Sequence, residues 1–321
     1  MMMSFRVLIP QDITEPGKQY LKSNGCEIKV LEDYSVENIC NNVEDCDAIL
    51  LRTATIPKEV FECSNKLKVI ARHGVGYDNI DLEAAKQHKV QICYTPEANA
   101  ESVAEHTIAL ILACAKNILY MDKVTRQGEW NLRNVVHPAT VSGKTLGIIG
   151  FGRIGRLVAQ KAALGLGMKV LVLARNLRKE DYPEYVNVCH DMEELIKTSD
   201  FLSLHAALTE ETTKIIDKEK LSWMKPTSFL INTARGAQVD EEALYEALKG
   251  GTIAGAGLDV FVTEPASKDN PLFELDHVIV SPHNAALTMD SMDKMGLMAA
   301  QGIMEVLMGK KVSWPVNSIE D

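Results

Sequence analysis

The sequence predicts an α/β protein built from two parallel-sheet domains. Three observations support this prediction: short apolar runs alternate with amphipathic segments, the alternation begins again in the second half, and 321 residues are about twice the length of one domain. Strands and helices in alternation form βαβ units, and such units build parallel sheets. The composition is 46% hydrophobic and 24% charged, which is enough apolar material for two cores.

The first hundred residues contain five apolar runs that are typical of strands. They are RVLIP (6–10), CEIKVL (26–31), AILLR (48–52), LKVIAR (67–72) and VQICY (90–94). Helical patterns such as EDYSVENICNNV (32–43) lie between several of them. A long helix is then expected over residues 103–120, with Ser102 and Glu105 as an S-x-x-E capping box at its start.

A polar connector over residues 128–143 separates this helix from a second series of strands. The runs are TLGIIG (145–150), MKVLVLA (168–174), FLSLHA (201–206), SFLINTA (228–234), AGAGLDVF (254–261) and HVIVSPH (277–283). The last segment, residues 289–308, has apolar positions three and four apart, which predicts a helix.

Charge, cysteines and termini exclude several classes of protein. The formal net charge is −10, whereas nucleic-acid binders usually carry a basic patch or stripe. The seven cysteines lack metal-ligand spacing, which predicts reduced thiols, no metal and a cytoplasmic protein. The N-terminus lacks the features of a secretory signal, and polar residues interrupt the 103–120 helix, so no membrane partner is expected.

A glycine pattern marks the start of the second series. Gly150-x-Gly152-x-x-Gly155 leaves the strand 144–150 and opens a helix. The first glycine allows the tight turn, the second lets the backbone approach a pyrophosphate, and the third permits close helix–strand packing. The phosphates would rest on the helix N-terminus. In this context a dinucleotide site is favoured over a turn that serves packing alone.

The end of the following strand indicates which dinucleotide is bound. An acid at this position accepts hydrogen bonds from a ribose 2′-hydroxyl, while an arginine accommodates a 2′-phosphate. Here Ala174 stands in the acid's place, and Arg175, Arg178 and Lys179 supply positive charge. We therefore predict a preference for NADP. The alternative is that Arg175 is a solvated surface residue and NAD is used.

Three charged residues lie at or just beyond the ends of the later strands. Arg235 follows SFLINTA, Glu264 comes soon after AGAGLDVF, and His283 ends HVIVSPH. Open α/β sheets bind ligands at the carboxyl ends of their strands. Taken singly, each residue would also fit a surface ion pair, a solvated carboxylate or a structural histidine.

Four stretches together resemble the D-isomer-specific 2-hydroxyacid dehydrogenase family. They are GFGRIG, INTARGAQVDEEAL, AGLDVFVTEP and SPHNAA, and the resemblance runs from RVLIP to WPVN. The family includes phosphoglycerate dehydrogenases and glyoxylate/hydroxypyruvate reductases. The resemblance implies two doubly wound domains, a Rossmann cofactor domain and a flavodoxin-like substrate domain.

In this family context Arg235, Glu264 and His283 are expected to be catalytic. An imidazole suits the proton that moves to or from the C2 oxygen during hydride transfer, because its ordinary pKa lies near neutrality. A carboxylate partner favours the imidazolium and orients it. An arginine can bind the substrate carboxylate through two hydrogen bonds and polarise the adjacent carbonyl.

The resemblance also implies binding residues. For the cofactor, beyond the glycines and residues 174–175, it points to Arg153, Ile154, Thr233, Ala234, Asp259, Asn284 and Ala286. For the substrate, besides Arg235 and His283, it points to Arg52, Gly74, Val75, Gly76 and Asn99. Backbone N–H groups of residues 74–76 can reach a carboxylate. Arg52 either binds a second anionic group, such as a phosphate, or only caps the edge of its strand.

Two departures from the family pattern concern loops near the cofactor. Ala206 and Ala207 replace a common Leu-Pro after the strand that ends at His205, and the helix after the glycine turn is one residue longer, through ALGLGMK. The chain ends soon after WPVN, so no appended regulatory domain is expected.

We therefore expect a substrate domain from residues 1–99 and 287–321 and a cofactor domain from residues 100–286. The resemblance implies a homodimer through the cofactor domains, partly by the helix that contains Ser102. The predicted activity is NAD(P)-dependent interconversion of a D-2-hydroxyacid and its 2-oxoacid, with D-3-phosphoglycerate as the first substrate candidate. The alternatives are a glyoxylate/hydroxypyruvate reductase and, in another class, a non-catalytic corepressor that senses the nicotinamide cofactor.

Overall fold

The computed structural model describes residues 4–174 and 182–318, and the chain divides into two compact units. The N-terminal unit consists of Met1–Asn99 and Ala286–Asp321, and the central unit consists of Ala100–Ala285. The chain returns to the N-terminal unit between Ala285 and Ala286, one residue before the position expected from the sequence.

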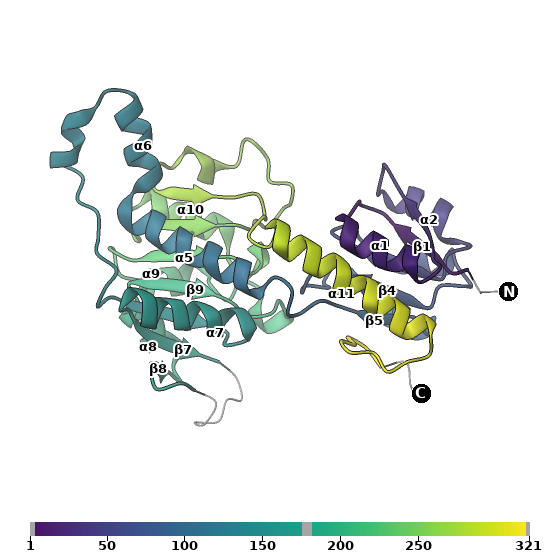
Figure 1. The fold of residues 1–321 in the computed structure, drawn as a ribbon. Coiled ribbons are helices and arrows are strands. Elements are labelled where there is room, and N and C mark those ends of the chain that lie inside the picture. The colour runs from purple at the N-terminus through teal and green to yellow at the C-terminus, as the bar shows by residue number, and fades with distance from the viewer. Residues whose placement is uncertain (1–3, 175–181, 319–321) are drawn as a thin grey trace. The chain divides into compact units, whose positions relative to one another are not determined.

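The N-terminal unit is built on a parallel sheet of five strands (Figure 1). They are β1 (Arg6–Ile9), β2 (Glu27–Val30), β3 (Ala48–Leu51), β4 (Val69–Arg72) and β5 (Gln91–Cys93). Their order is β2-β1-β3-β4-β5, and each neighbouring pair is parallel. This is the flavodoxin-like order, so the predicted fold class is confirmed for this unit.

Two apolar cores cover the two faces of this sheet. Leu8 of β1 belongs to one core, whereas Val7 and Ile9 belong to the other. Successive side chains of a strand point to opposite faces, so a strand that is buried on both sides is apolar throughout. The helices of this unit are α1 (Glu15–Ser23), α2 (Val36–Val43), α3 (Lys58–Glu62), α4 (Leu82–Gln87) and α11 (Met289–Leu307).

Helix α11 brings the end of the chain back beside its beginning, as the yellow and purple ribbons of Figure 1 show. It packs against α1, where a Cβ atom at Gly17 would lie 2.6 Å from the backbone oxygen of Gly296. Only a glycine permits so close an approach. The helix predicted over residues 289–308 is confirmed and ends one residue earlier.

The central unit contains a parallel sheet of seven strands. They are β6 (Thr145–Ile149), β7 (Lys169–Leu173), β8 (Val186–Val188), β9 (Phe201–Leu204), β10 (Phe229–Asn232), β11 (Gly255–Leu258) and β12 (Val278–Val280). The order is β12-β11-β10-β9-β6-β7-β8, which is the Rossmann order with a seventh strand added. The sequence prediction missed β8, because three residues at the edge of a sheet are too few to show a strand pattern.

Helices lie along this sheet, and the longest predicted helix proves to be two. The helices are α5 (Ala100–Lys116), α6 (Ile118–Arg126), α7 (Arg153–Gln160), α8 (Met192–Thr198), α9 (Lys218–Trp223) and α10 (Glu241–Lys249). The prediction of one helix over residues 103–120 is wrong, because Asn117 has a φ of +52° and the chain bends by 56° there. Asparagine adopts this left-handed conformation more readily than most residues.

The predicted capping box at the start of this helix is also wrong. Helix α5 begins at Ala100, so Ser102 lies inside its first turn. The Ser102 hydroxyl donates to the backbone oxygen of Ala285 at 2.6 Å instead of capping α5. A tertiary contact has therefore taken the place of the local one.

The extra residue noted after the glycine turn falls in a π-helix. Helix α7 ends at Gln160 and continues as a π-helix over Lys161–Gly165. Hydrogen bonds that run from i to i+5 hold more residues per turn than those of an α-helix, which accounts for the added length.

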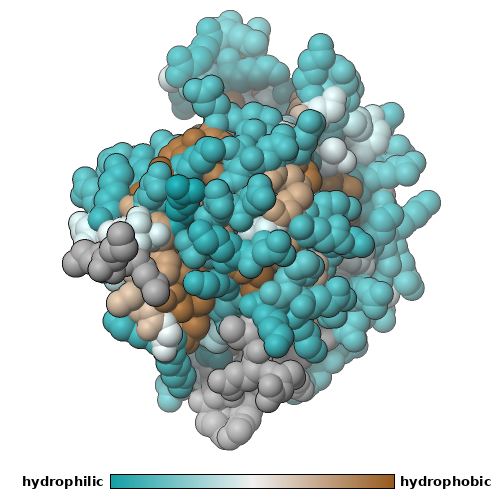
Figure 2. Space-filling model, turned by 90° about the vertical axis from the view of Figure 1, so that its right-hand side faces the viewer, coloured by the Kyte–Doolittle hydropathy of each residue, from teal (hydrophilic) through white to brown (hydrophobic). Residues whose placement is uncertain are grey.

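The surface shown in Figure 2 is covered mostly by hydrophilic residues, in agreement with the 24% of charged residues in the chain. Within the described ranges, no single helix is both long and apolar enough to cross a membrane. Helices α5 and α6 meet that criterion only as a bent pair.

Candidate active site

The glycine turn connects β6 to α7. Gly150 has a φ of +95°, and a Cβ atom there would lie 2.5 Å from the backbone nitrogen of Ala206. A Cβ atom at Gly155 would lie 2.3 Å from the backbone oxygen of Gly150. A Cβ atom at Gly152, in contrast, would have no described atom within 4 Å. Gly150 and Gly155 are thus required by packing, while Gly152 borders open space.

This open space fits the diphosphate of a dinucleotide. Helix α7 begins at Arg153, and its N-cap Gly152 makes no side-chain cap. The first N–H groups of a helix have no partners within that helix and can bind an anion. Gly152, Arg153 and Ile154 are the residues that would hold the diphosphate, as the sequence predicted.

The end of β7 lies beside this turn, because the Gly150 N–H donates to the Leu173 carbonyl at 2.9 Å. Ala174 follows directly and packs partly buried against the core of the central unit. It places no carboxylate beside the turn. The predicted contact Arg175, with Arg178 and Lys179, lies outside the described residues.

A buried asparagine shapes the turn that carries Thr233, Ala234 and Arg235. The Asn232 side chain, at the end of β10, donates to the Arg235 carbonyl at 2.9 Å and accepts from the Ala234 N–H at 3.0 Å. Thr233 shares a hydroxyl–hydroxyl hydrogen bond of 2.9 Å with Thr107 of α5. The sequence analysis missed Asn232 and Thr107, although a buried polar residue at a strand end is a signal for such a role.

His283 and Glu264 form a direct pair. The Nδ1 atom of His283 lies 2.6 Å from Oε2 of Glu264, and the two side chains are 42% and 36% exposed. Oε1 of Glu264 accepts from the Phe261 N–H at 3.0 Å. Because Nδ1 faces the carboxylate, Nε2 is the ring nitrogen available for proton exchange with a substrate.

The electrostatics keep Glu264 ionised. Burial acts to raise its pKa, but the hydrogen bonds from His283 and from the Phe261 N–H, together with the charges of His283 and Arg235, lower the pKa below its ordinary value. The influence of Arg235 on this carboxylate means that the three predicted catalytic residues gather in one place. They come from three segments that follow β10, β11 and β12.

Asp259 is placed differently from the prediction. It follows β11, is 1% exposed, and its carboxylate accepts hydrogen bonds from Ser281, Asn284 and Ala285. These partners assign Asp259 to holding the segment around His283. A direct contact of Asp259 or Asn284 with the cofactor stays a prediction.

Comparisons with known proteins decide the family. A family model described as "D-isomer specific 2-hydroxyacid dehydrogenase, NAD binding domain" matches residues 108–285. A glyoxylate reductase of Korarchaeum cryptofilum is 39% identical over 315 residues, which are 95% of this chain and 93% of that protein. The chain belongs to the D-isomer specific 2-hydroxyacid dehydrogenase family. It is an NAD(P)-dependent oxidoreductase that acts on a small hydroxyacid or oxoacid.

Two further relatives carry different names. A D-3-phosphoglycerate dehydrogenase of Archaeoglobus fulgidus is 38% identical over 313 residues, and the match spans 97% of this chain but 59% of that protein. A solved structure of an NADPH-dependent glyoxylate/hydroxypyruvate reductase from Sinorhizobium meliloti, in complex with NADP and malonate, has a TM-score of 0.88 and 27% identity. That match covers 99% of this chain and 98% of the other.

In this dehydrogenase the predicted substrate residues Arg52, Gly74, Val75, Gly76 and Asn99 belong to the N-terminal unit, as does the predicted cofactor residue Ala286. The Arg52 guanidinium donates to the Asp12 carbonyl at 2.8 Å. The N–H of Gly74 was expected to face a carboxylate, but it donates to the Thr95 hydroxyl at 2.8 Å. Val75 and Gly76 are left as the candidates for that role.

Arg72 was not predicted, yet it lies against the substrate loop. A Cβ atom at Gly74 would be 2.7 Å from the Arg72 Nη1 atom, and this guanidinium donates to the His73 carbonyl. The side chain of Asn99 is also buried, and its Oδ1 atom has no hydrogen-bond partner among residues 4–174 and 182–318. A buried oxygen without a partner at the edge of a unit is consistent with a role in binding.

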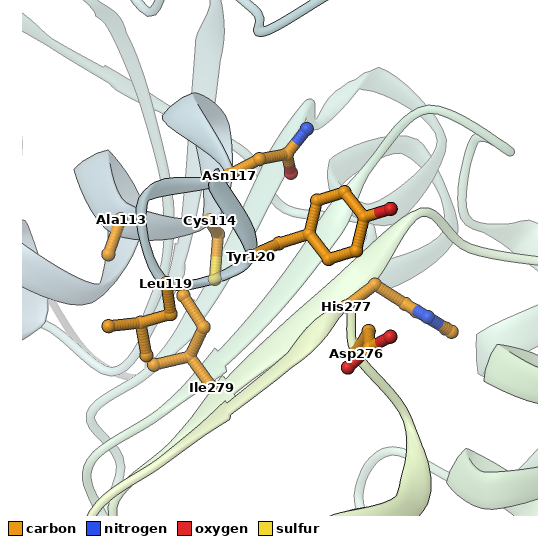
Figure 3. Close-up of a pocket in the computed structure, with 8 residues that line it drawn as sticks. All are labelled: Ala113, Cys114, Asn117, Leu119, Tyr120, Asp276, His277 and Ile279. Atoms are coloured by element: carbon orange, nitrogen blue, oxygen red, sulfur yellow. The ribbon is translucent and has the colours of Figure 1, made fainter. Parts of the chain in front are cut away.

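The small pocket of Figure 3 is not the active site. It lies where α5 bends into α6 and is lined by residues that include Asn117, Tyr120 and His277. Its volume of about 10 Å³ is close to that of one water molecule. His277 precedes β12, whereas His283 follows it, so the pocket and the catalytic histidine are at opposite ends of that strand. In the part of the chain that is described, no cluster of His, Cys, Asp and Glu has the makings of a metal site.

Proposed function

We propose that this dehydrogenase interconverts a D-2-hydroxyacid and its 2-oxoacid with His283 as proton donor and acceptor, Glu264 as its partner and Arg235 as the carboxylate ligand. The observation that carries the proposal is the 2.6 Å contact between His283 Nδ1 and Glu264 Oε2, with Arg235 close enough to act on the same carboxylate.

Each residue has a distinct task. The nicotinamide cofactor, when bound, supplies or accepts the hydride at C2 of the substrate. His283 gives the proton at Nε2 to the C2 oxygen in reduction and takes it back in oxidation. Glu264 is ionised because of its lowered pKa and stabilises the imidazolium that oxidation forms. Arg235 binds the substrate carboxylate and polarises the carbonyl group.

The direct test replaces the histidine. His283→Gln should lower kcat for every 2-oxoacid about a thousandfold, because general acid–base catalysis contributes about 10²- to 10⁴-fold. His190→Gln, an exposed histidine of the same unit, is the matched control and should leave kcat unchanged. The loss of reduced-cofactor absorbance measures both. An undiminished rate in the His283→Gln variant would refute the proposed mechanism.

For the substrate, D-3-phosphoglycerate and its 2-oxoacid are our first candidates. They are supported by the name of the Archaeoglobus fulgidus relative and by Arg52, a cation at the end of β3 in the N-terminal unit. Glyoxylate or hydroxypyruvate is the second candidate, supported by the names of the Korarchaeum and Sinorhizobium proteins. Values of kcat/KM for the three oxoacids decide between them. Arg52→Gln should reduce kcat/KM for the phosphorylated oxoacid alone if the first candidate is correct.

For the cofactor, we propose a preference for NADP over NAD. The support is the absence of a carboxylate at Ala174 beside the glycine turn, and the relative from Sinorhizobium meliloti is named NADPH-dependent. Ala174→Asp should shift the ratio of kcat/KM values toward NAD, since a carboxylate repels a 2′-phosphate and binds the 2′-hydroxyl. A tenfold preference of the unmodified protein for NAD would contradict the proposal.

We also propose a cytoplasmic homodimer that forms through the central unit. The segment that follows α5 exposes four large apolar side chains, Ile118, Leu119, Trp130 and Val135. Figure 1 shows α6 extending away from the sheet of its own unit. Trp130→Glu should convert a dimeric mass in light scattering into a monomeric one. An unmodified protein with the mass of one chain would contradict the dimer.

A further inference from the structure

The segment that carries His283 is held in an unfavourable backbone conformation. His283 has a φ of +49°, which few residues other than glycine adopt. Such a conformation persists only where surrounding contacts fix it. The contacts that fix this segment therefore also fix the position of the imidazole.

The carboxylate of Asp259 supplies several of these contacts. Its Oδ1 atom accepts from the Asn284 N–H, and its Oδ2 atom accepts from the Ala285 N–H, both at 3.0 Å. The backbone oxygen of Asp259 accepts from the N–H of His283 at 2.7 Å. One buried residue thus binds three successive N–H groups, and its side-chain rotamer must be right for two of them.

Two residues outside the predicted site fix that rotamer. The Ser281 hydroxyl donates to Oδ1 of Asp259 at 2.5 Å, and Nε2 of His106 on α5 lies 2.9 Å from the same hydroxyl oxygen. A hydroxyl has one proton to donate. Because that proton goes to Asp259, His106 must donate to Ser281, so His106 carries its proton on Nε2.

Helix α5 contacts the same segment a second time. Ser102 and His106 are four residues apart and lie on one face of α5. Ser102 donates to the Ala285 carbonyl at 2.6 Å, while His106 donates to Ser281. The two ends of the segment 281–285 are thus attached to the same helix.

We propose that His106 and Ser281 are positioning residues for the reaction. The chain of hydrogen bonds from His106 through Ser281 to Asp259 holds the backbone of residues 283–285, and thereby holds His283 against Glu264. This inference rests on the proposed role of His283. Arg235 follows a different strand, β10, so weakening the chain should impair proton transfer and leave binding of the substrate carboxylate nearly unchanged.

Two pairs of variants test the inference. Ser281→Ala removes the hydroxyl and Ser281→Thr keeps it; His106→Leu removes the donor and His106→Gln keeps an N–H at a similar reach. We expect Ser281→Ala and His106→Leu to lower kcat about tenfold to a hundredfold, since a displacement of about 1 Å can cost a hundredfold in rate. The KM for the oxoacid should change less than about twofold, in line with the separate location of Arg235.

A solvent deuterium isotope effect separates positioning from loss of folded enzyme. If proton transfer is slowed, the isotope effect on kcat rises in Ser281→Ala and His106→Leu and returns in Ser281→Thr and His106→Gln. Fewer folded molecules would lower kcat without changing the isotope effect. Active-site titration by binding of reduced cofactor counts the folded molecules. Ser222→Ala, an exposed serine whose hydroxyl donates to Glu219 of its own helix, is the control.

The outcomes are distinct. Unchanged kcat per active site in Ser281→Ala and His106→Leu, or a loss without a rise in the isotope effect, overturns this inference. If Ser281→Ala fails to fold, the His106 pair decides, because His106 is 26% exposed and tolerates replacement better. If His283→Gln also keeps full activity, the proposed function fails together with this inference. If only His283→Gln is inactive, this inference fails alone.

Discussion

His73 of the N-terminal unit and His283 of the central unit each lie just beyond a parallel strand, β4 and β12 respectively. The first is 4% exposed, and burial, with the charges of Arg52 and Arg72, lowers its pKa to about 4. The second is 42% exposed and pairs with Glu264. One residue type at one kind of position is therefore kept neutral in one unit and given an anionic partner in the other.

The comparison shows that partners, not position along a strand, decide what a histidine can do. His73 has cations nearby and is surrounded by protein, so it is unsuited to hold a proton at neutral pH. The loop next to it offers backbone N–H groups. His283 has a carboxylate on one ring nitrogen and solvent access on its side chain, which is the arrangement for proton exchange.

Removing the anionic partner would make His283 resemble His73, and this change should have the largest effect. Glu264→Gln keeps the shape of the side chain but removes its charge. We expect kcat for oxoacid reduction to fall about a thousandfold, since the partner of a catalytic histidine both orients it and stabilises its charged form. The pH at which reduction falls to half its maximum should also move down. Glu274→Gln, an exposed carboxylate of the same unit, is the control, and a retained kcat would contradict the role of Glu264.

The neutral histidine predicts a pH dependence of stability. The pKa of His73 is about 4 in the folded protein against 6.5 ordinarily, so between these pH values the unfolded chain binds a proton that the folded chain does not. Stability contributed by neutral His73 is thus present above pH 6.5 and is lost as pH falls, by about 3 kcal/mol near pH 4. His73→Gln should lose less stability than the unmodified protein between pH 7 and pH 4 in urea unfolding. His88→Gln, an exposed histidine of the same unit, should behave like the unmodified protein.

Two glycines of the central unit should separate packing from ligand binding at a third strand end. Gly150→Ala should destabilise the protein by about 2 kcal/mol or more, because its φ is +95° and a Cβ atom would clash with Ala206. Gly152→Ala should keep the stability within about 0.5 kcal/mol. It should weaken cofactor binding about tenfold, since the methyl group would fill the space of the diphosphate. Thermal melting and cofactor titration measure the two effects. Equal cofactor affinity in Gly152→Ala would rule out a diphosphate at this turn.

The smallest expected effect concerns the loop beside that turn. Gln238 is fully buried, and its Nε2 atom donates to the carbonyls of Ala206 at 3.0 Å and Ala207 at 3.3 Å. Gln238→Leu should cost about 1–2 kcal/mol, because it leaves buried carbonyls without their donor. The exposed Gln127→Leu serves as the control in the same unfolding experiment. Equal stability of the two variants would show that the loop does not depend on Gln238.

The sequence predicted most of the fold because its signals are local. A strand buried on both faces is an apolar run whatever its neighbours are, which is why β1, β3, β6 and β10 lie within the runs expected for them. The glycine turn was also found, since its spacing is a local requirement of the backbone. The errors have a common cause as well. The break at Asn117 and the hydrogen bond of Ser102 to Ala285 depend on residues distant in sequence, and β8 depends on pairing with β7.

By itself the sequence determined two parallel sheets, the position of the glycine turn and the residues Arg235, Glu264 and His283 as the catalytic candidates, because each follows from a short stretch of chain. Only the tertiary structure decided that Asp259 faces residues 281–285, that His106 and Ser281 fix its carboxylate, and that His73 is neutral. The physical reason is that hydrogen-bond partners and burial come from segments far apart in the chain, and they set both the orientation and the charge of a side chain.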